Sequence, residues 1–188
     1  MGCASSKSSA ADARGVDVRI EGGVQCEAIF FPDPCMPCRS YLQGGALCRR
    51  PNCSFAHEET SLVKLLRVLQ RATRTLDVAV FTITCNEIAD ALEAAAQRGV
   101  TVRIISDDEQ AKSKGSDVAR LAKVKNVQVR HDGNAASHMH HKFAIVDGAC
   151  LINGSFNWTR AAVRHGRTNL QALSFSSFIL AGRPNPEL

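Results

Sequence analysis

The chain has 188 residues, 45% hydrophobic and 22% charged, a composition that excludes wholesale disorder and fits one domain with a hydrophobic core. Its formal net charge of +5 favours anionic partners such as phosphate esters, nucleic acid or acidic lipid headgroups. No run of 18 apolar residues occurs, so we expect no transmembrane span, and the polar start does not resemble a secretory signal.

Residues 1–23 are rich in Ser, Ala and Gly and are predicted to form a flexible leader. They begin Met-Gly-Cys-Ala-Ser-Ser, which fits N-myristoylation of Gly2 once Met1 is removed. The adjacent Cys3 is a candidate for palmitoylation, and two acyl chains anchor a protein more durably than one. The prediction is peripheral attachment to the cytosolic face of a membrane, with the plasma membrane or a related membrane favoured. The alternative is that the Gly-Cys pair is accidental.

A strand is expected at residues 25–32, followed by an irregular Cys-, Pro- and Gly-rich segment at 33–57. Four residues of this segment follow the spacing C-x9-C-x4-C-x3-H, namely Cys38, Cys48, Cys53 and His57, with Cys35 as an alternative first ligand. Three thiolates and an imidazole make a closed tetrahedral zinc site. We therefore expect a structural zinc in an atypical CCCH finger. The alternative is a loop whose cysteines pack or form adventitious disulfides.

Strands and helices alternate through the rest of the chain. Helices are expected at residues 58–74, 86–99, 116–125 and 157–164, and strands at 76–83, 100–106, 127–130, 141–148, 149–155 and 168–175. Thr60 or Ser61 is expected to cap the first helix; Asn86 is expected to cap the second and Gly99 to end it. This order predicts an α/β domain at residues 24–180, with a mixed sheet flanked by helices, and a tail at 181–188.

Three of the six histidines lie within four positions, at His138, His140 and His141. Side chains alternate along a strand, so His140 and Lys142 share one face while His141 and Asp147 share the other. A turn after Asp147 would return the chain to Gly154 and Ser155. A helix start expected just beyond them, together with Ser155 and Asn157, would offer donors to an anion. Histidine can attack phosphorus, so these groups suit hydrolysis of a phosphate ester.

The full spacing, His140-x-Lys142-x4-Asp147-x6-Gly154-Ser155-x-Asn157, resembles the HKD signature of the phospholipase D superfamily. From about Ile29 to about Asn169 the chain is similar to its small single-HKD subgroup, the mitochondrial cardiolipin hydrolases and insect Zucchini. The resemblance implies a phospholipase D-like sheet carrying one HKD half and a small zinc-binding insertion.

The same resemblance implies a homodimer that needs no cofactor for catalysis. His140 would act as nucleophile in one subunit and as acid/base in the other. Lys142, Ser155 and Asn157 would bind the phosphate, and Asp147 would support the site. His138 and His141 lie outside the signature and are expected to be structural or to support the residues that contact the substrate. Thr168 stands where the subgroup carries Glu, and the last residues differ from its long C-terminal helix. We therefore expect weaker activity, or another carboxylate in that role.

Three functions follow from these expectations. The first is hydrolysis of a phospholipid of cardiolipin or phosphatidylcholine type to phosphatidic acid. The second is cleavage of single-stranded RNA or DNA along a groove of basic residues, Lys112, Lys114, Lys123, Lys125, Arg160, Arg164 and Arg167. The third is a catalytically weak membrane adaptor. The subgroup makes the mitochondrial outer membrane the alternative location.

Overall fold

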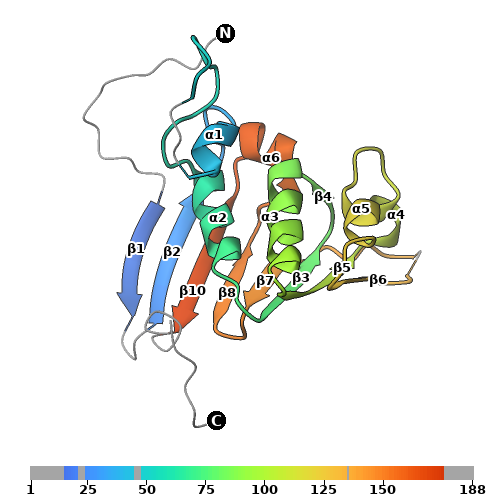
Figure 1. Cartoon of the computed structure of the whole chain (residues 1–188). Coiled ribbons are helices and arrows are strands. Elements are labelled where there is room, and N and C mark those ends of the chain that lie inside the picture. Colours follow the sequence, from blue (N-terminus) through green and yellow to red (C-terminus); the bar gives the residue numbers. More distant parts are fainter. Residues whose placement is uncertain (1–14, 21–23, 45–47, 135, 176–188) are drawn as a thin grey trace.

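The computed structural model describes residues 15–20, 24–44, 48–134 and 136–175. Gly2, Cys3 and the expected tail lie outside these residues. An eight-stranded sheet has the order β1-β2-β10-β8-β7-β3-β5-β6 (Figure 1). Its strands are β1 (Gly15–Ile20), β2 (Val24–Phe30), β3 (Thr75–Val80), β5 (Thr101–Ser106), β6 (Val127–His131), β7 (Lys142–Val146), β8 (Cys150–Gly154) and β10 (Asn169–Phe175). Two short strands, β4 (Ile83–Thr84) and β9 (Trp158–Thr159), pair with each other in parallel.

The sheet is mixed, as the alternation of elements predicts. Strands β3, β5 and β6 are parallel, whereas β7, β8, β10, β2 and β1 follow in antiparallel pairs. The carboxyl ends of β3, β5 and β8 therefore reach the same edge of the sheet as the first residues of β7 and β10. Most of the candidate active-site residues predicted from the sequence lie at this edge.

Helices α2 (Ser61–Gln70) and α3 (Asn86–Gln97) lie side by side over one face of the sheet (Figure 1). Alternate residues of β5 point into the core beneath them: Val102 and Ile104 are buried, whereas Arg103 and Ile105 are exposed. The shorter helices are α1 (Arg39–Leu42), α4 (Asp108–Ala111), α5 (Val118–Leu121) and α6 (Arg160–His165). None of the helices in the described ranges is long and apolar enough to cross a bilayer.

Three local expectations are wrong. Residues 15–20 form edge strand β1, paired with β2, rather than part of a flexible leader. Cys85, not Asn86, occupies the N-cap position of α3. The helix expected at 157–164 begins only at Arg160, because residues 158–159 are used in β9, and the Thr159 hydroxyl caps it by accepting from the Ala162 N–H. No helix start therefore follows Gly154 and Ser155 directly.

Candidate active site and metal centre

His140, just before β7, and Lys142, its first residue, lie on the same side of the chain, as predicted, and both lie against the ring of Phe81, which directly follows β3. The His140 ring meets the Phe81 ring edge-on, with 4.9 Å between centroids, and the Lys142 ammonium lies 5.7 Å from the same centroid. Lys142 also donates to the His140 carbonyl at 2.9 Å. Partial burial lowers the pKa of Lys142 and leaves the ammonium less hydrated, which strengthens its attraction for a phosphate. His141 faces the other way and contacts Phe143.

His138 also belongs to this cluster, and its contacts with Phe81 and Asp107 were not predicted from the sequence. Its ring packs edge-on against Phe81 at 5.5 Å, and its Nδ1 lies 3.1 Å from a carboxylate oxygen of Asp107. Asp107 follows β5 and is 1% exposed, and the backbone N–H groups of Met139 and Gln110 also donate to it. The sequence held one indication of this grouping: Phe81 and Asp107 directly follow two neighbouring parallel strands, whose carboxyl ends meet at one edge of the sheet.

Gly154 and Ser155 form a tight junction with the start of β10. A Cβ at Gly154 would lie 2.4 Å from the Asn169 carbonyl oxygen, so only glycine permits this approach. The backbone N–H groups of Ser155 and Phe156 both donate to that oxygen, and the Ser155 hydroxyl donates to Asn169 Oδ1 at 3.0 Å. Phe143 of β7 pairs with Asn153 of β8, so Lys142 lies beside this junction. Asn169 is a further polar group that sequence reasoning did not assign to the site.

Asn157 and Thr168 flank the junction and carry unused hydrogen-bonding capacity. The Asn157 Oδ1 and Thr168 Oγ1 atoms are buried and have no hydrogen-bond partner among the described residues. The Thr168 backbone carbonyl accepts from the Phe31 N–H at 2.9 Å. Thr168 supplies no charge to the site. A buried carboxylate does reach a histidine of the cluster, because Asp107 lies against the ring of His138.

Asp147 lies at the far end of β7, away from His140 and Lys142. Its carboxylate accepts four hydrogen bonds of 2.8–2.9 Å, from the backbone of Thr73, Arg74 and Thr75 and from the Thr73 hydroxyl. Burial alone would raise the pKa of this carboxyl, but those backbone donors lower it below its usual value. The signature aspartate therefore fixes the loop that leads into β3.

The predicted zinc ligands come together around α1. One ligand atom from each of Cys38, Cys48, Cys53 and His57 lies within 4.8 Å of the others, and the Cys38 and Cys53 sulfurs are 4.0 Å apart. This cluster of described residues uses Cys38 rather than Cys35. Burial alone would raise the pKa of Cys38, but N–H groups of Ser40 and Tyr41 and the neighbouring thiols lower it to about 6. Three cysteine sulfurs and one imidazole gathered at this spacing fit a tetrahedral zinc ion.

The residues just before and at the start of the cysteine-rich segment are joined to the rest of the domain near the Gly154–Ser155 junction. Phe31 stacks on Phe156, with centroids 3.9 Å apart and an interplanar angle of 13°. Phe156 is the variable residue between Ser155 and Asn157. Asp33 donates its N–H to the Val163 carbonyl, and its carboxylate accepts from the first two N–H groups of α2. Phe31, which lies just before the cysteine-rich segment, therefore packs against the residue that follows Ser155.

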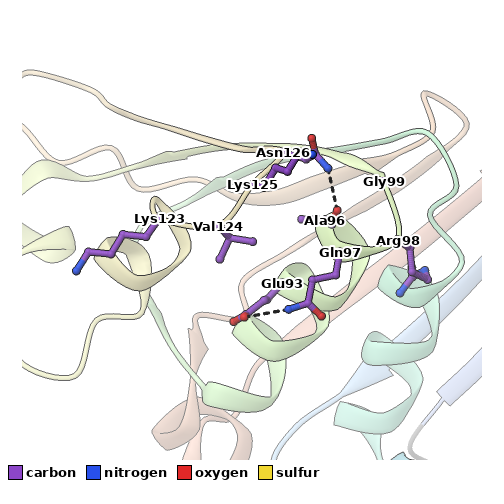
Figure 2. A pocket seen from close by; sticks show the side chains of 9 residues that line it. All are labelled: Glu93, Ala96, Gln97, Arg98, Gly99, Lys123, Val124, Lys125 and Asn126. Carbon is purple, nitrogen blue, oxygen red and sulfur yellow. Dashed lines mark hydrogen bonds between the residues drawn. The ribbon is translucent and has the colours of Figure 1, made fainter.

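The seven basic residues do not form one groove. Lys123 and Lys125 precede β6 and border a cavity of about 650 Å³ beside the last turn of α3 (Figure 2). The pairing of β6 with β5, and of β3 with β7, puts the start of β6 at the end of the sheet opposite the start of β7 and His140. Three others are engaged: Lys112 lies 4.0 Å from Asp108, Arg160 lies 3.5 Å from Glu87, and Arg164 donates to the Pro34 carbonyl. Lys123 and Lys125 therefore cannot guide a strand past His140.

Comparison with known proteins matches most of the chain to one family. The family described as cardiolipin synthase, PLD-like domain, matches residues 65–177. The mitochondrial cardiolipin hydrolase of Chlamydomonas reinhardtii is 49% identical over 155 residues, which cover 82% of this chain and 68% of the relative.

Two solved structures share the architecture. Nuc from Salmonella typhimurium, a phospholipase D family member, has a TM-score of 0.56 and 28% identity, covering 62% of this chain and 76% of Nuc. NucT from Helicobacter pylori has a TM-score of 0.61 at 23% identity, covering 85% of this chain and 91% of NucT. The likeness to NucT shows a common fold.

Proposed function

This chain belongs to the phospholipase D-like family and is a phosphodiesterase of that superfamily, and from this premise we propose that it hydrolyses a phospholipid of cardiolipin or phosphatidylcholine type to phosphatidic acid. The observation that carries the proposal is the grouping of His140 and Lys142 beside the Gly154–Ser155 junction. The name of the Chlamydomonas relative, cardiolipin hydrolase, supports the lipid substrate.

In the proposed reaction, the His140 imidazole attacks phosphorus and forms a phosphohistidine while the alcohol leaves. Lys142, Ser155 and Asn157 bind the phosphate oxygens, and Lys142 offsets their developing charge. The leaving oxygen is protonated by His140 of a second copy of the chain, since a twofold interface brings the same residue of each subunit together. Asp147 supports the site indirectly, because its carboxylate holds the loop that leads into β3.

A single-strand-specific endonuclease is the alternative, because the same chemistry breaks any phosphodiester. The separation of Lys123 and Lys125 from His140 disfavours it, since strand binding needs a continuous basic track. The third function, a catalytically weak membrane adaptor, is favoured only by Thr168, which puts an uncharged side chain where the subgroup carries Glu.

We expect the purified protein to release phosphatidic acid from cardiolipin vesicles in EDTA, and His140→Asn to release none. Labelled single-stranded RNA incubated in parallel should stay intact. Cleavage of RNA that depends on His140 would instead establish the endonuclease, and no turnover of either substrate would establish the adaptor. His141→Asn is the matched control, because His141 faces away from the cluster and its replacement should preserve activity.

A structural zinc held by Cys38, Cys48, Cys53 and His57 is part of this proposal. We expect about one zinc per purified chain, and Cys48→Ser combined with Cys53→Ser should remove it. The melting temperature should fall by roughly 5–10 °C, equivalent to about 2–3 kcal/mol for a chain of this size. Cys26→Ser, outside the cluster, is the control for losing a thiol. Full metal content in the double variant would contradict the assignment.

We further propose that acylation at Gly2 and Cys3 attaches the protein to the cytosolic face of a membrane. Myristate alone binds a bilayer weakly, so palmitate at Cys3 would determine residence. The plasma membrane or a related membrane is favoured, and the name of the Chlamydomonas relative supports the mitochondrial outer membrane as the alternative.

A further inference from the structure

Two exposed apolar side chains lie on either side of the site, at the same edge of the sheet as His140. Phe30, the last residue of β2, is 41% exposed and pairs with Asn169 at the start of β10. Ile105, the last residue but one of β5, is 37% exposed. Strand β7 lies between β2 and β5 in the sheet (Figure 1). Five strand spacings separate β2 from β5, so the two side chains lie about 24 Å apart with the site between them.

Both side chains point away from the long helices. Phe30 follows the buried Ile29, and Ile105 follows the buried Ile104. Helix α2 contacts β2 and helix α3 contacts β5, so the buried residues face the helices. Successive residues of a strand face opposite sides, which puts Phe30 and Ile105 on the other face. Single exposed apolar side chains are ordinary on a protein surface, whereas two that share a face and an edge and flank a site indicate a contact surface.

An exposed arginine accompanies each apolar side chain. Arg130 of β6 pairs with Ile105, and Arg167 lies two residues before Asn169, the partner of Phe30. Neither guanidinium has an ion pair among the residues that the structure describes. Apolar side chains that enter the interface and cations that meet lipid phosphates together bind proteins to anionic bilayers. We call these four residues the docking rim: Phe30, Ile105, Arg130 and Arg167.

The carboxylates that follow β5 and β6 would repel an anionic surface, but they are buried or engaged. Asp107 is 1% exposed. Asp108 lies 4.0 Å from the Lys112 ammonium, and Asp132 accepts from the Asp108 N–H at 3.1 Å. The arginines of the docking rim therefore remain available to lipid phosphates.

The position of β1 agrees with a bilayer at this edge. Strand β1 begins at Gly15, which pairs with Ile29 beside Phe30, so an N-terminal acyl chain would tether this edge rather than the opposite end. A twofold axis parallel to the strands would bring the two copies of His140 together and leave both docking rims facing the same side.

We propose that the docking rim binds the protein to an anionic bilayer and so brings lipid phosphates to His140 and Lys142. This inference rests on the proposed hydrolysis of phospholipid. The apolar pair would enter the boundary between headgroups and acyl chains, and the arginines would lie at the level of the phosphates. The scissile phosphodiester lies at that same level, so the site would reach it without extracting the lipid.

The test uses the full chain purified without acyl groups and cosedimented with phosphatidylcholine vesicles that contain cardiolipin. Phe30→Ser combined with Ile105→Ser should weaken binding roughly ten-fold, because it removes the apolar area that enters the bilayer. Arg130→Gln combined with Arg167→Gln should weaken binding roughly thirty-fold at low salt and less at high salt. Turnover of cardiolipin in vesicles should fall in both variants. Turnover of bis(4-nitrophenyl) phosphate, a soluble phosphodiester, should stay unchanged.

The matched control is Lys123→Gln combined with Lys125→Gln, which removes two exposed cations at the opposite end of the sheet and should preserve vesicle binding. Unchanged vesicle binding in both rim variants would overturn the docking rim. Rim variants that become monomers by light scattering and lose turnover of both substrates would show that a second copy covers the rim, and would overturn it as well. Unmodified protein that binds vesicles and cleaves the soluble substrate but no lipid would instead overturn the proposed lipid hydrolysis.

Discussion

Replacing His140 by asparagine is expected to reduce turnover of any phosphodiester by a factor on the order of 10⁴ or more, because the asparagine amide has no nucleophilic nitrogen to attack phosphorus. Asparagine keeps a polar side chain of similar length, so the packing around Phe81 should tolerate it. Rates are measured with cardiolipin vesicles and with bis(4-nitrophenyl) phosphate. An unchanged circular dichroism spectrum and melting temperature would show that the loss is chemical.

The same variant tests the twofold site. If both copies of His140 are needed, a mixed dimer of unmodified and His140→Asn chains is inactive. Equal amounts of the two chains, allowed to exchange, should then show about a quarter of the activity of the unmodified dimer. About half of that activity would indicate that each subunit works alone, and would exclude the partner histidine as the acid.

Replacing Asp147 by asparagine is expected to lower the free energy of unfolding by about 3 kcal/mol, because a charged acceptor of four short hydrogen bonds becomes a neutral amide that turns N–H groups toward backbone donors. Urea unfolding at neutral pH measures the change. The matched control is Asp77→Asn, which breaks a partly exposed ion pair with Arg103 and should cost less than about 1 kcal/mol.

The loss at Asp147 should also depend on pH. Since the folded-state pKa of this carboxyl lies below its unfolded value, its contribution is complete above about pH 4 and is lost as the pH falls through the folded pKa. The difference in stability between the unmodified protein and Asp147→Asn should therefore shrink in acid. A difference that stays constant from pH 7 to pH 2 would contradict the assigned hydrogen bonds.

The sequence by itself determined the family, the mixed α/β sheet and the proximity of His140 to Lys142. These depend on local regularities, namely the signature spacing, the alternation of strands and helices, and the two-residue period of a strand. The spacing of Cys38, Cys48, Cys53 and His57 likewise indicated a four-ligand cluster, and the structure brings those side chains together.

Only the tertiary structure decided which distant residues meet at the edge of the sheet. Asp107 reaches His138 across 31 positions, and Asn169 reaches Ser155 across 14, because the strand order places β5, β7, β8 and β10 with these ends aligned. The same order separates Lys123 and Lys125 from His140. Local patterns specify strands and faces, but the pairing of strand ends depends on packing of the whole sheet, which no single segment encodes.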